Sequence, residues 1–75
     1  MAPRAQRRPL RTRLATAVRS LRSERSWTQE QAAEAVGLNP RHYQKIEEGT
    51  VNTTLRTLEL LCRGFSVDVV ELLKP

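Results

Sequence analysis

The sequence predicts an all-α protein, a compact bundle of five short helices, and two observations carry this prediction. Five segments have apolar residues at helical spacing, and each is bounded by residues that cap or end a helix. No segment shows the alternation typical of a strand, and the sequence has no internal repeat. Its 75 residues allow one domain with one modest core.

Composition excludes several classes of protein. The single cysteine, Cys62, excludes an intramolecular disulfide framework, and together with the single histidine, His42, it supplies too few ligands for a structural zinc site. We therefore expect no metal and no cofactor. No apolar run approaches the roughly 18 residues that a membrane span needs. The basic N-terminus also lacks the apolar stretch of a signal peptide, so we expect a cytoplasmic protein with no membrane partner.

The net charge of +5 is unevenly distributed. Residues 1–23 carry seven arginines and no acid, whereas residues 24–75 carry six basic and eight acidic side chains. Residues 1–11 have two prolines and no periodicity, which predicts a disordered basic arm followed by one domain over 12–75. Three roles are open for the arm: attraction of a polyanion, an inert tail, or an organelle transit peptide. The last is disfavoured because the first helix needs residues 12–23.

The first two helices are predicted from an apolar face and a cap. The apolar residues of the first helix, which starts near residue 12, fall within one arc of a helical wheel: Leu14, Ala17, Val18 and Leu21. Thr28 and Gln31 have the spacing of a capping box, which predicts a second helix over 29–36.

The third helix has a start and a stop signal close together. Gly37 can adopt the left-handed backbone that ends the second helix, and Asn39 then caps the third. Pro40 suits the first helical position because an amide hydrogen there has no partner. The helix is predicted to run to about Glu48, where Gly49 ends it.

The last two helices are predicted over 55–63, capped by Thr54, and over 67–74, capped by Ser66. The apolar arc of the fourth helix is expected to be buried, with Cys62 at its edge: Leu55, Leu58 and Leu61. Cys62 is therefore expected to be a buried, unreactive thiol, with a redox switch as the alternative.

Two short helices joined by a turn of three or four residues containing glycine form a helix-turn-helix arrangement. Ala33 is expected where the two helices approach closely, Gly37 in the turn, and Tyr43 and Ile46 facing the core. The remaining face of the third helix is polar and is expected to meet a partner: Arg41, His42, Gln44, Lys45 and Glu48.

Four segments in this order and spacing resemble the phage repressor and Cro family, the XRE-type helix-turn-helix: "LRSERSWTQEQAAEAVGL", "YQKIEEG", "NTTLRTLELL" and "SVDVVELL". The resemblance extends from Leu14 to Leu73. It implies a lambda repressor-like domain of five helices whose third helix enters the major groove of double-stranded DNA. Such domains usually bind as dimers on a two-fold symmetric operator.

The resemblance also implies roles for individual residues. Base reading is expected from Arg41, Gln44 and Lys45, although a merely solvated face is the alternative without the family pattern. Contacts at the rim or to phosphates are expected from Gln29, Asn39, Pro40, His42, Thr50, Asn52 and Thr53. Arg22 and Glu47 match a family ion pair. Tyr43 stands where the family usually has a branched aliphatic residue, so its hydroxyl is expected to reach the surface or a partner.

A dimer surface is expected on the fourth and fifth helices. Leu60 lies off the core arc, and the apolar residues of the fifth helix span more than one core face. Together with the pairing usual in the family, this predicts a homodimer interface at Leu60, Val69, Leu72 and Leu73.

The function predicted is a sequence-specific DNA-binding transcription regulator, acting as a homodimer on the bacterial nucleoid. The alternative is an interaction module, such as an antitoxin or controller subunit, that binds a toxin-like protein or RNA polymerase. An enzyme is not expected, because Glu47 and Glu48 point in different directions, His42 stands alone, and no phosphate-cradling glycine motif is present.

Overall fold

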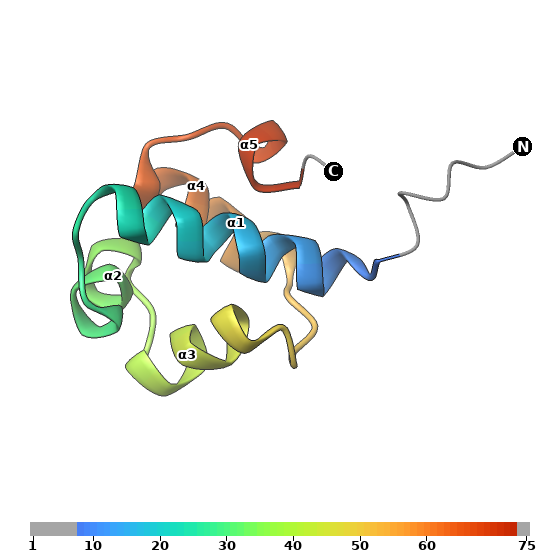
Figure 1. The fold of residues 1–75 in the computed structure, drawn as a ribbon, viewed down its shortest axis with the longest axis horizontal. Coiled ribbons are helices and arrows are strands. Elements are labelled where there is room, and N and C mark those ends of the chain that lie inside the picture. Colours follow the sequence, from blue (N-terminus) through green and yellow to red (C-terminus); the bar gives the residue numbers. More distant parts are fainter. Residues whose placement is uncertain (1–7, 74–75) are drawn as a thin grey trace, which may run out of the picture.

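Residues 8–73 are described by a computed structural model, and they form five helices around one core, which confirms the all-α prediction (Figure 1). The helices are α1 (Leu10–Glu24), α2 (Gln29–Val36), α3 (Pro40–Glu48), α4 (Leu55–Phe65) and α5 (Val69–Leu73). α1 runs through the middle of the fold, with α3 on one side and α5 on the other. Most of the predicted arm lies outside the described residues, as does the predicted end of the fifth helix.

The core is built from one face of each helix. Its buried side chains are Leu14, Val18, Leu21, Ala32, Ala33, Val36, Tyr43, Ile46, Leu61, Phe65 and Leu72. On α1 the buried arc includes Ala15, whereas Ala17, which the wheel placed in the core, is half-buried. The arc is shifted because α3 and α5 both pack on this helix, so its buried surface is wider than a single stripe.

Helix α1 begins at Leu10, two residues before the predicted start. The Pro9 carbonyl accepts hydrogen bonds from the amides of Thr12 (3.0 Å) and Arg13 (3.1 Å), so Pro9 stands at the N-cap with φ −57°. Leu10 and Arg11, predicted to belong to the arm, are therefore helical.

The cap between α1 and α2 is the predicted capping box. The Gln31 amide donates to Thr28 Oγ1 (3.0 Å), and the Thr28 amide donates to Gln31 Oε1 (2.8 Å). At the other end Gly37 has φ 76°, the left-handed backbone expected there. Both ends of α2 are thus set by side chains and backbone within four residues.

Gly64 does not end α4; the helix continues to Phe65, two residues beyond the predicted end. A Cβ atom at this glycine would lie 2.5 Å from Val36 Cγ1 and 2.6 Å from Val36 Cα. The glycine therefore lets the backbones of α2 and α4 meet, and it is a packing residue inside the helix.

Ser66, predicted to cap α5, instead ends α4 in the left-handed conformation (φ 58°). The Asp68 carboxylate accepts from the Val70 amide (3.2 Å), and the Asp68 carbonyl accepts from the Glu71 amide (2.9 Å). Helix α5 consequently begins at Val69.

Burial corrects two predictions for α4 and α5. Leu55, expected in the core, is 79% exposed; in the first turn of α4 the buried side chain is that of Thr57 instead. Leu72, expected at a dimer interface, is fully buried in the core and cannot contribute an exposed surface. Leu60 and Leu73 are half-buried, whereas Val69 and Val70 are 41% and 67% exposed.

Cys62 is half-buried. Burial raises the pKa of its thiol, and the nearby carboxylates of Asp68 and Glu59 raise it further. The raised pKa favours the protonated thiol near neutral pH, although the side chain is only half-buried and not buried as expected.

Three arginines of the α1 region donate to carbonyl groups near the ends of other helices. Arg13 Nη2 donates to Leu73 O in α5 (2.8 Å), Arg19 donates to Glu47 O in α3, and Arg25 donates to Phe65 O in α4. The last carbonyls of a helix lack intrahelical partners and carry partial negative charge. These guanidinium groups therefore stabilise the fold, and none of them belongs to the predicted arm over residues 1–11.

Replacing Gly64 by alanine tests the close packing of α2 on α4. Helix propensity alone predicts that the alanine variant gains up to about 1 kcal/mol of stability. Because the new methyl would overlap Val36, we expect instead a loss of about 1–3 kcal/mol in the free energy of unfolding, measured by urea titration. Part of the loss should be recovered in a Val36→Ala background. A stabilised Gly64→Ala variant would contradict the packing described here.

Candidate nucleic-acid interface

The two ends of α3 are fixed by the residues predicted from the sequence. Asn39 Oδ1 accepts from the amides of Arg41 (2.8 Å) and His42 (3.3 Å), and Pro40 occupies the first helical position. Gly49 has φ 73° and ends the helix after Glu48. The Asn39 side-chain oxygen is therefore occupied by capping, and only its amide nitrogen is available to a ligand.

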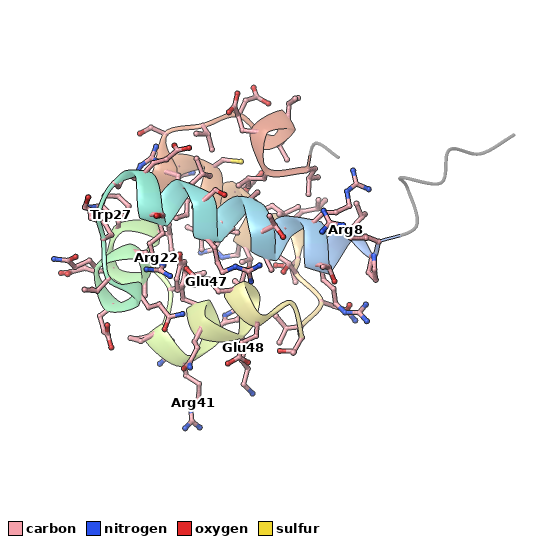
Figure 2. The ribbon with its side chains drawn as sticks, viewed as in Figure 1. Arg8, Arg22, Trp27, Arg41, Glu47 and Glu48 are labelled. Atoms are coloured by element: carbon pink, nitrogen blue, oxygen red, sulfur yellow. The ribbon has the colours of Figure 1, made fainter. Side chains whose placement is uncertain are left out.

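Helix α3 divides into a buried and an exposed face. Tyr43, Ile46 and Glu47 are buried, as the sequence predicted for the first two. The exposed side chains are Asn39, Pro40, Arg41, Gln44, Lys45 and Glu48, while His42 is half-buried at the boundary. Figure 2 shows Arg41 and Glu48 on the side of α3 that faces away from α1. The polar face predicted to meet a partner is therefore open to solvent.

The buried carboxylate of Glu47 joins three helices, and the ion pair expected with Arg22 is present (Figure 2). Arg22 Nε lies 2.6 Å from Glu47 Oε2, and Arg22 Nη2 donates to Oε1 (3.1 Å). Gln29 Nε2 donates to the same Oε1 (2.9 Å). Arg22 Nη1 also donates to the carbonyl of Trp27 (3.1 Å), which ties the loop before α2 into this group.

The Glu47 environment favours the charged form of both partners. Burial alone would raise the pKa of Glu47. The hydrogen bonds from Arg22 and Gln29 favour the carboxylate and outweigh burial, so the pKa lies below its ordinary value. The hydrogen bond to Glu47 raises the pKa of Arg22. The pair is therefore fully ionised near neutral pH.

The Tyr43 hydroxyl contradicts the expectation that it would reach the surface or a partner. The oxygen is buried beside the Arg22–Glu47 pair, and within residues 8–73 it has no partner in hydrogen-bonding geometry. Burial, followed by the Glu47 carboxylate, raises the pKa of Tyr43 far above its usual range. The ring fills the core like the aliphatic residue it replaces, and this leaves its hydroxyl inside the protein.

The remaining predicted rim residues are less uniformly placed. Gln29 is half-buried, and because a carboxylate can only accept, its amide group must face Glu47 with one N–H left to donate elsewhere. Thr50 and Asn52 are exposed. Thr53 departs from the prediction, since its hydroxyl oxygen is buried without a partner in the described part of the chain. That hydroxyl does not point toward a DNA backbone.

Sequence reasoning missed one residue around this site. Arg19 donates to the carbonyl of Glu47 and so holds the last turn of α3, and its place one turn before Arg22 on α1 was the available signal. Glu48 is exposed on the polar face where the sequence placed it, although no individual role was predicted for it.

Other kinds of site find no support in residues 8–73. This part of the chain contains no group of three or more His, Cys, Asp or Glu side chains arranged to hold a metal ion. Nor does it contain a helix with the length and apolar character to span a bilayer.

Two short helices at a glycine turn, with the second presenting a polar face outward, define a helix-turn-helix protein. A helix-turn-helix family model matches residues 18–72. The chain belongs to this family, of the XRE type that its sequence motifs predict. Residues 18–72 are therefore a helix-turn-helix domain, a fold that binds double-stranded DNA.

Relatives with known sequences or structures agree with this assignment. Over 55 residues the chain is 36% identical to the cryptic phage CTXphi transcriptional repressor RstR of Vibrio cholerae, a match over 73% of this chain and half of that repressor. The crystal structure of the hypothetical transcription factor NHTF from Neisseria superposes with TM-score 0.86 at 29% identity, covering 100% of this chain and 84% of that one. The restriction-modification controller protein C.Esp1396I superposes with TM-score 0.75 at 32% identity, covering 83% and 82%.

Replacing Glu47 by glutamine tests the ionic contact beneath α3. Near neutral pH we expect a loss of about 2 kcal/mol in the free energy of unfolding, since a hydrogen-bonded charge pair is broken. The folded-state pKa of Glu47 is depressed, so its contribution is present above the unfolded pKa of about 4.3 and disappears as the pH falls through the folded value. The difference between wild type and variant should therefore shrink toward acid pH.

Urea titrations between pH 7 and pH 3 measure this difference. Glu34→Gln, which removes an exposed carboxylate of α2, is the matched control and should leave the pH profile unchanged. A wild-type advantage over Glu47→Gln that stays constant down to pH 3 would show that the carboxylate charge is not involved.

Proposed function

We propose that the protein is a sequence-specific transcription regulator that binds double-stranded DNA as a homodimer on a two-fold symmetric operator. The observation that carries this proposal is the exposed polar face of α3. The opposite face of the helix packs on the rest of the domain through Tyr43, Ile46 and Glu47. In a helix-turn-helix dimer the two such helices enter successive major grooves, about 34 Å apart. The site of action is then the bacterial nucleoid.

Base reading falls to Arg41, Gln44 and Lys45, all exposed on one face of α3. Arginine and lysine pair with the O6 and N7 acceptors of guanine, and glutamine pairs with the N6 and N7 groups of adenine. Each good pair discriminates against a wrong base by about 1–3 kcal/mol. These three side chains therefore suffice for a preferred half-site.

Contacts to the DNA backbone would set the register. The free N–H of Gln29 and the first amides of α2 suit a phosphate, because the N-terminus of a helix carries partial positive charge. Thr50 and Asn52 extend the same edge beyond Gly49. Asn39, Pro40 and His42 border the reading face.

The α4–α5 surface supports the dimer. A groove between the two helices has an apolar floor that includes Leu58 and Cys62, and the exposed side chains of Leu55 and Val69 lie at its edge. The groove also carries charges of both signs: Glu59, Arg63 and Asp68. A two-fold interface brings the same patch against itself, so acids and a base within one patch can pair across the axis. Leu60 and Leu73 remain candidate contacts.

The relatives support regulation of transcription: RstR is a transcriptional repressor, and C.Esp1396I is a restriction-modification controller protein. A toxin-like protein or RNA polymerase would compete for the same apolar groove. The oligomeric state in solution distinguishes these partners from a second copy of the chain.

The reading role of Arg41 is tested with two variants in gel-shift titrations on a selected operator and on random duplex. Arg41→Ala should lower affinity for the preferred site by about 5- to 150-fold, the equivalent of one base contact. Arg41→Lys keeps the charge but loses the planar fork, so it should bind random duplex like wild type and show a weaker preference at one position per half-site. An equal loss on every sequence would make Arg41 a phosphate contact.

The dimer is tested by charged substitutions at exposed apolar positions. Leu55→Lys and Val70→Lys should weaken self-association at least about tenfold, as burying an unpaired charge is costly, while the thermal melting temperature of the monomer stays the same. Sedimentation equilibrium measures both variants. Ala35→Lys, which adds the same charge at an exposed position of α2, is the control. Unchanged association in both variants would exclude the α4–α5 surface as the interface.

A further inference from the structure

The exposed face of α3 contains one side chain whose charge opposes DNA. Glu48 is exposed, and among residues 8–73 its carboxylate forms no ion pair or side-chain hydrogen bond. It lies one helical turn beyond Gln44 and two turns beyond Arg41, so the three side chains share one stripe of the helix. Figure 2 shows Arg41 and Glu48 on this same outer side.

The carboxylate is unfavourable there for two reasons. It ends α3, where the helix dipole disfavours a negative charge. It also reduces the positive charge that the stripe offers to phosphates, which weakens binding to every DNA sequence. The carboxylate of Glu47, its neighbour in sequence, has no such cost, because Arg22 balances its charge and both Arg22 and Gln29 donate hydrogen bonds to it. A hydrogen-bond donor on the DNA itself would offset the charge of Glu48 in a complex.

We propose that Glu48 is a specificity-determining residue that accepts a hydrogen bond from the N4 amine of cytosine in the major groove. Cytosine is the base whose major-groove edge has a donor and no acceptor. Adenine places the N7 acceptor beside its amine, while guanine and thymine present acceptors, and all of these repel a carboxylate. This inference rests on the proposed function, because it assumes that α3 enters the groove.

The spacing on α3 adds a geometric expectation. Glu48 lies seven positions after Arg41, which is about 10 Å along a helix. This distance corresponds to about three base-pair steps of B-form DNA when the helix follows the groove. Each half-site should therefore carry a guanine read by Arg41 and a cytosine read by Glu48 about three base pairs apart.

The experiment is selection of binding sites from a random duplex pool by the full chain, for wild type, Glu48→Ala and Glu48→Gln. Wild type should favour cytosine at one position per half-site by about 5- to 150-fold. Glu48→Ala should lose that preference and bind random duplex more tightly than wild type. Glu48→Gln should replace cytosine by adenine, because an amide pairs with the N6 and N7 groups of adenine.

Glu34→Gln, which removes an exposed carboxylate from α2, is the control and should leave the selected sequence unchanged. Thermal melting of all variants checks that the fold is intact. If Glu48→Ala selects the wild-type sequence at every position and merely binds all DNA more tightly, the carboxylate lies near phosphates and the inference is overturned. If wild type itself selects no sequence, the proposed function fails, and the inference fails with it.

Discussion

The orientation of α3 depends on the buried carboxylate of Glu47. It receives hydrogen bonds from Arg22 of α1 at 2.6 and 3.1 Å and from Gln29 of α2 at 2.9 Å, so one side chain of α3 is bound to both neighbouring helices. Apolar burial of Ile46 and Tyr43 holds the helix down but is not directional. Hydrogen bonds have preferred angles, and they fix how the helix is rotated about its axis. The buried contacts of Glu47 thereby determine which side chains of α3 face the solvent.

Several arginines within residues 8–73 hold helices together. The guanidinium groups of Arg13, Arg19 and Arg25 donate to carbonyls near the ends of α5, α3 and α4. Arginine suits this role because its planar group can donate to several acceptors and is always charged. On the exposed face of α3 the positive charge comes from Arg41 and Lys45, so in the proposed complex each would have a large share of the electrostatic effect.

Features that depend on residues close in the sequence could be predicted from the sequence, whereas features that depend on contacts between helices could not. The caps at Thr28 and Asn39 depend on residues two or three positions away, so the sequence predicts them and, with them, the outward face of α3. Gly64 resembles a helix end locally, but its role comes from Val36 on another helix. A helical wheel could not predict that Leu72 would face the core. Which side of a five-residue helix is buried depends on how the neighbouring helices pack against it. The buried hydroxyl of Tyr43 likewise follows from packing that no local pattern contains.

The contact between Gly64 and Val36 connects the two surfaces to which we assign roles. Helix α4 carries the apolar groove, and α2 leads through the glycine turn into α3, so the missing side chain at Gly64 lets the supports of both surfaces pack directly on each other. In the proposed homodimer, the separation of the two reading helices is then a fixed length rather than an adjustable one. The absence of a single methyl group thereby helps to set how many base pairs must separate the centres of the two halves of an operator.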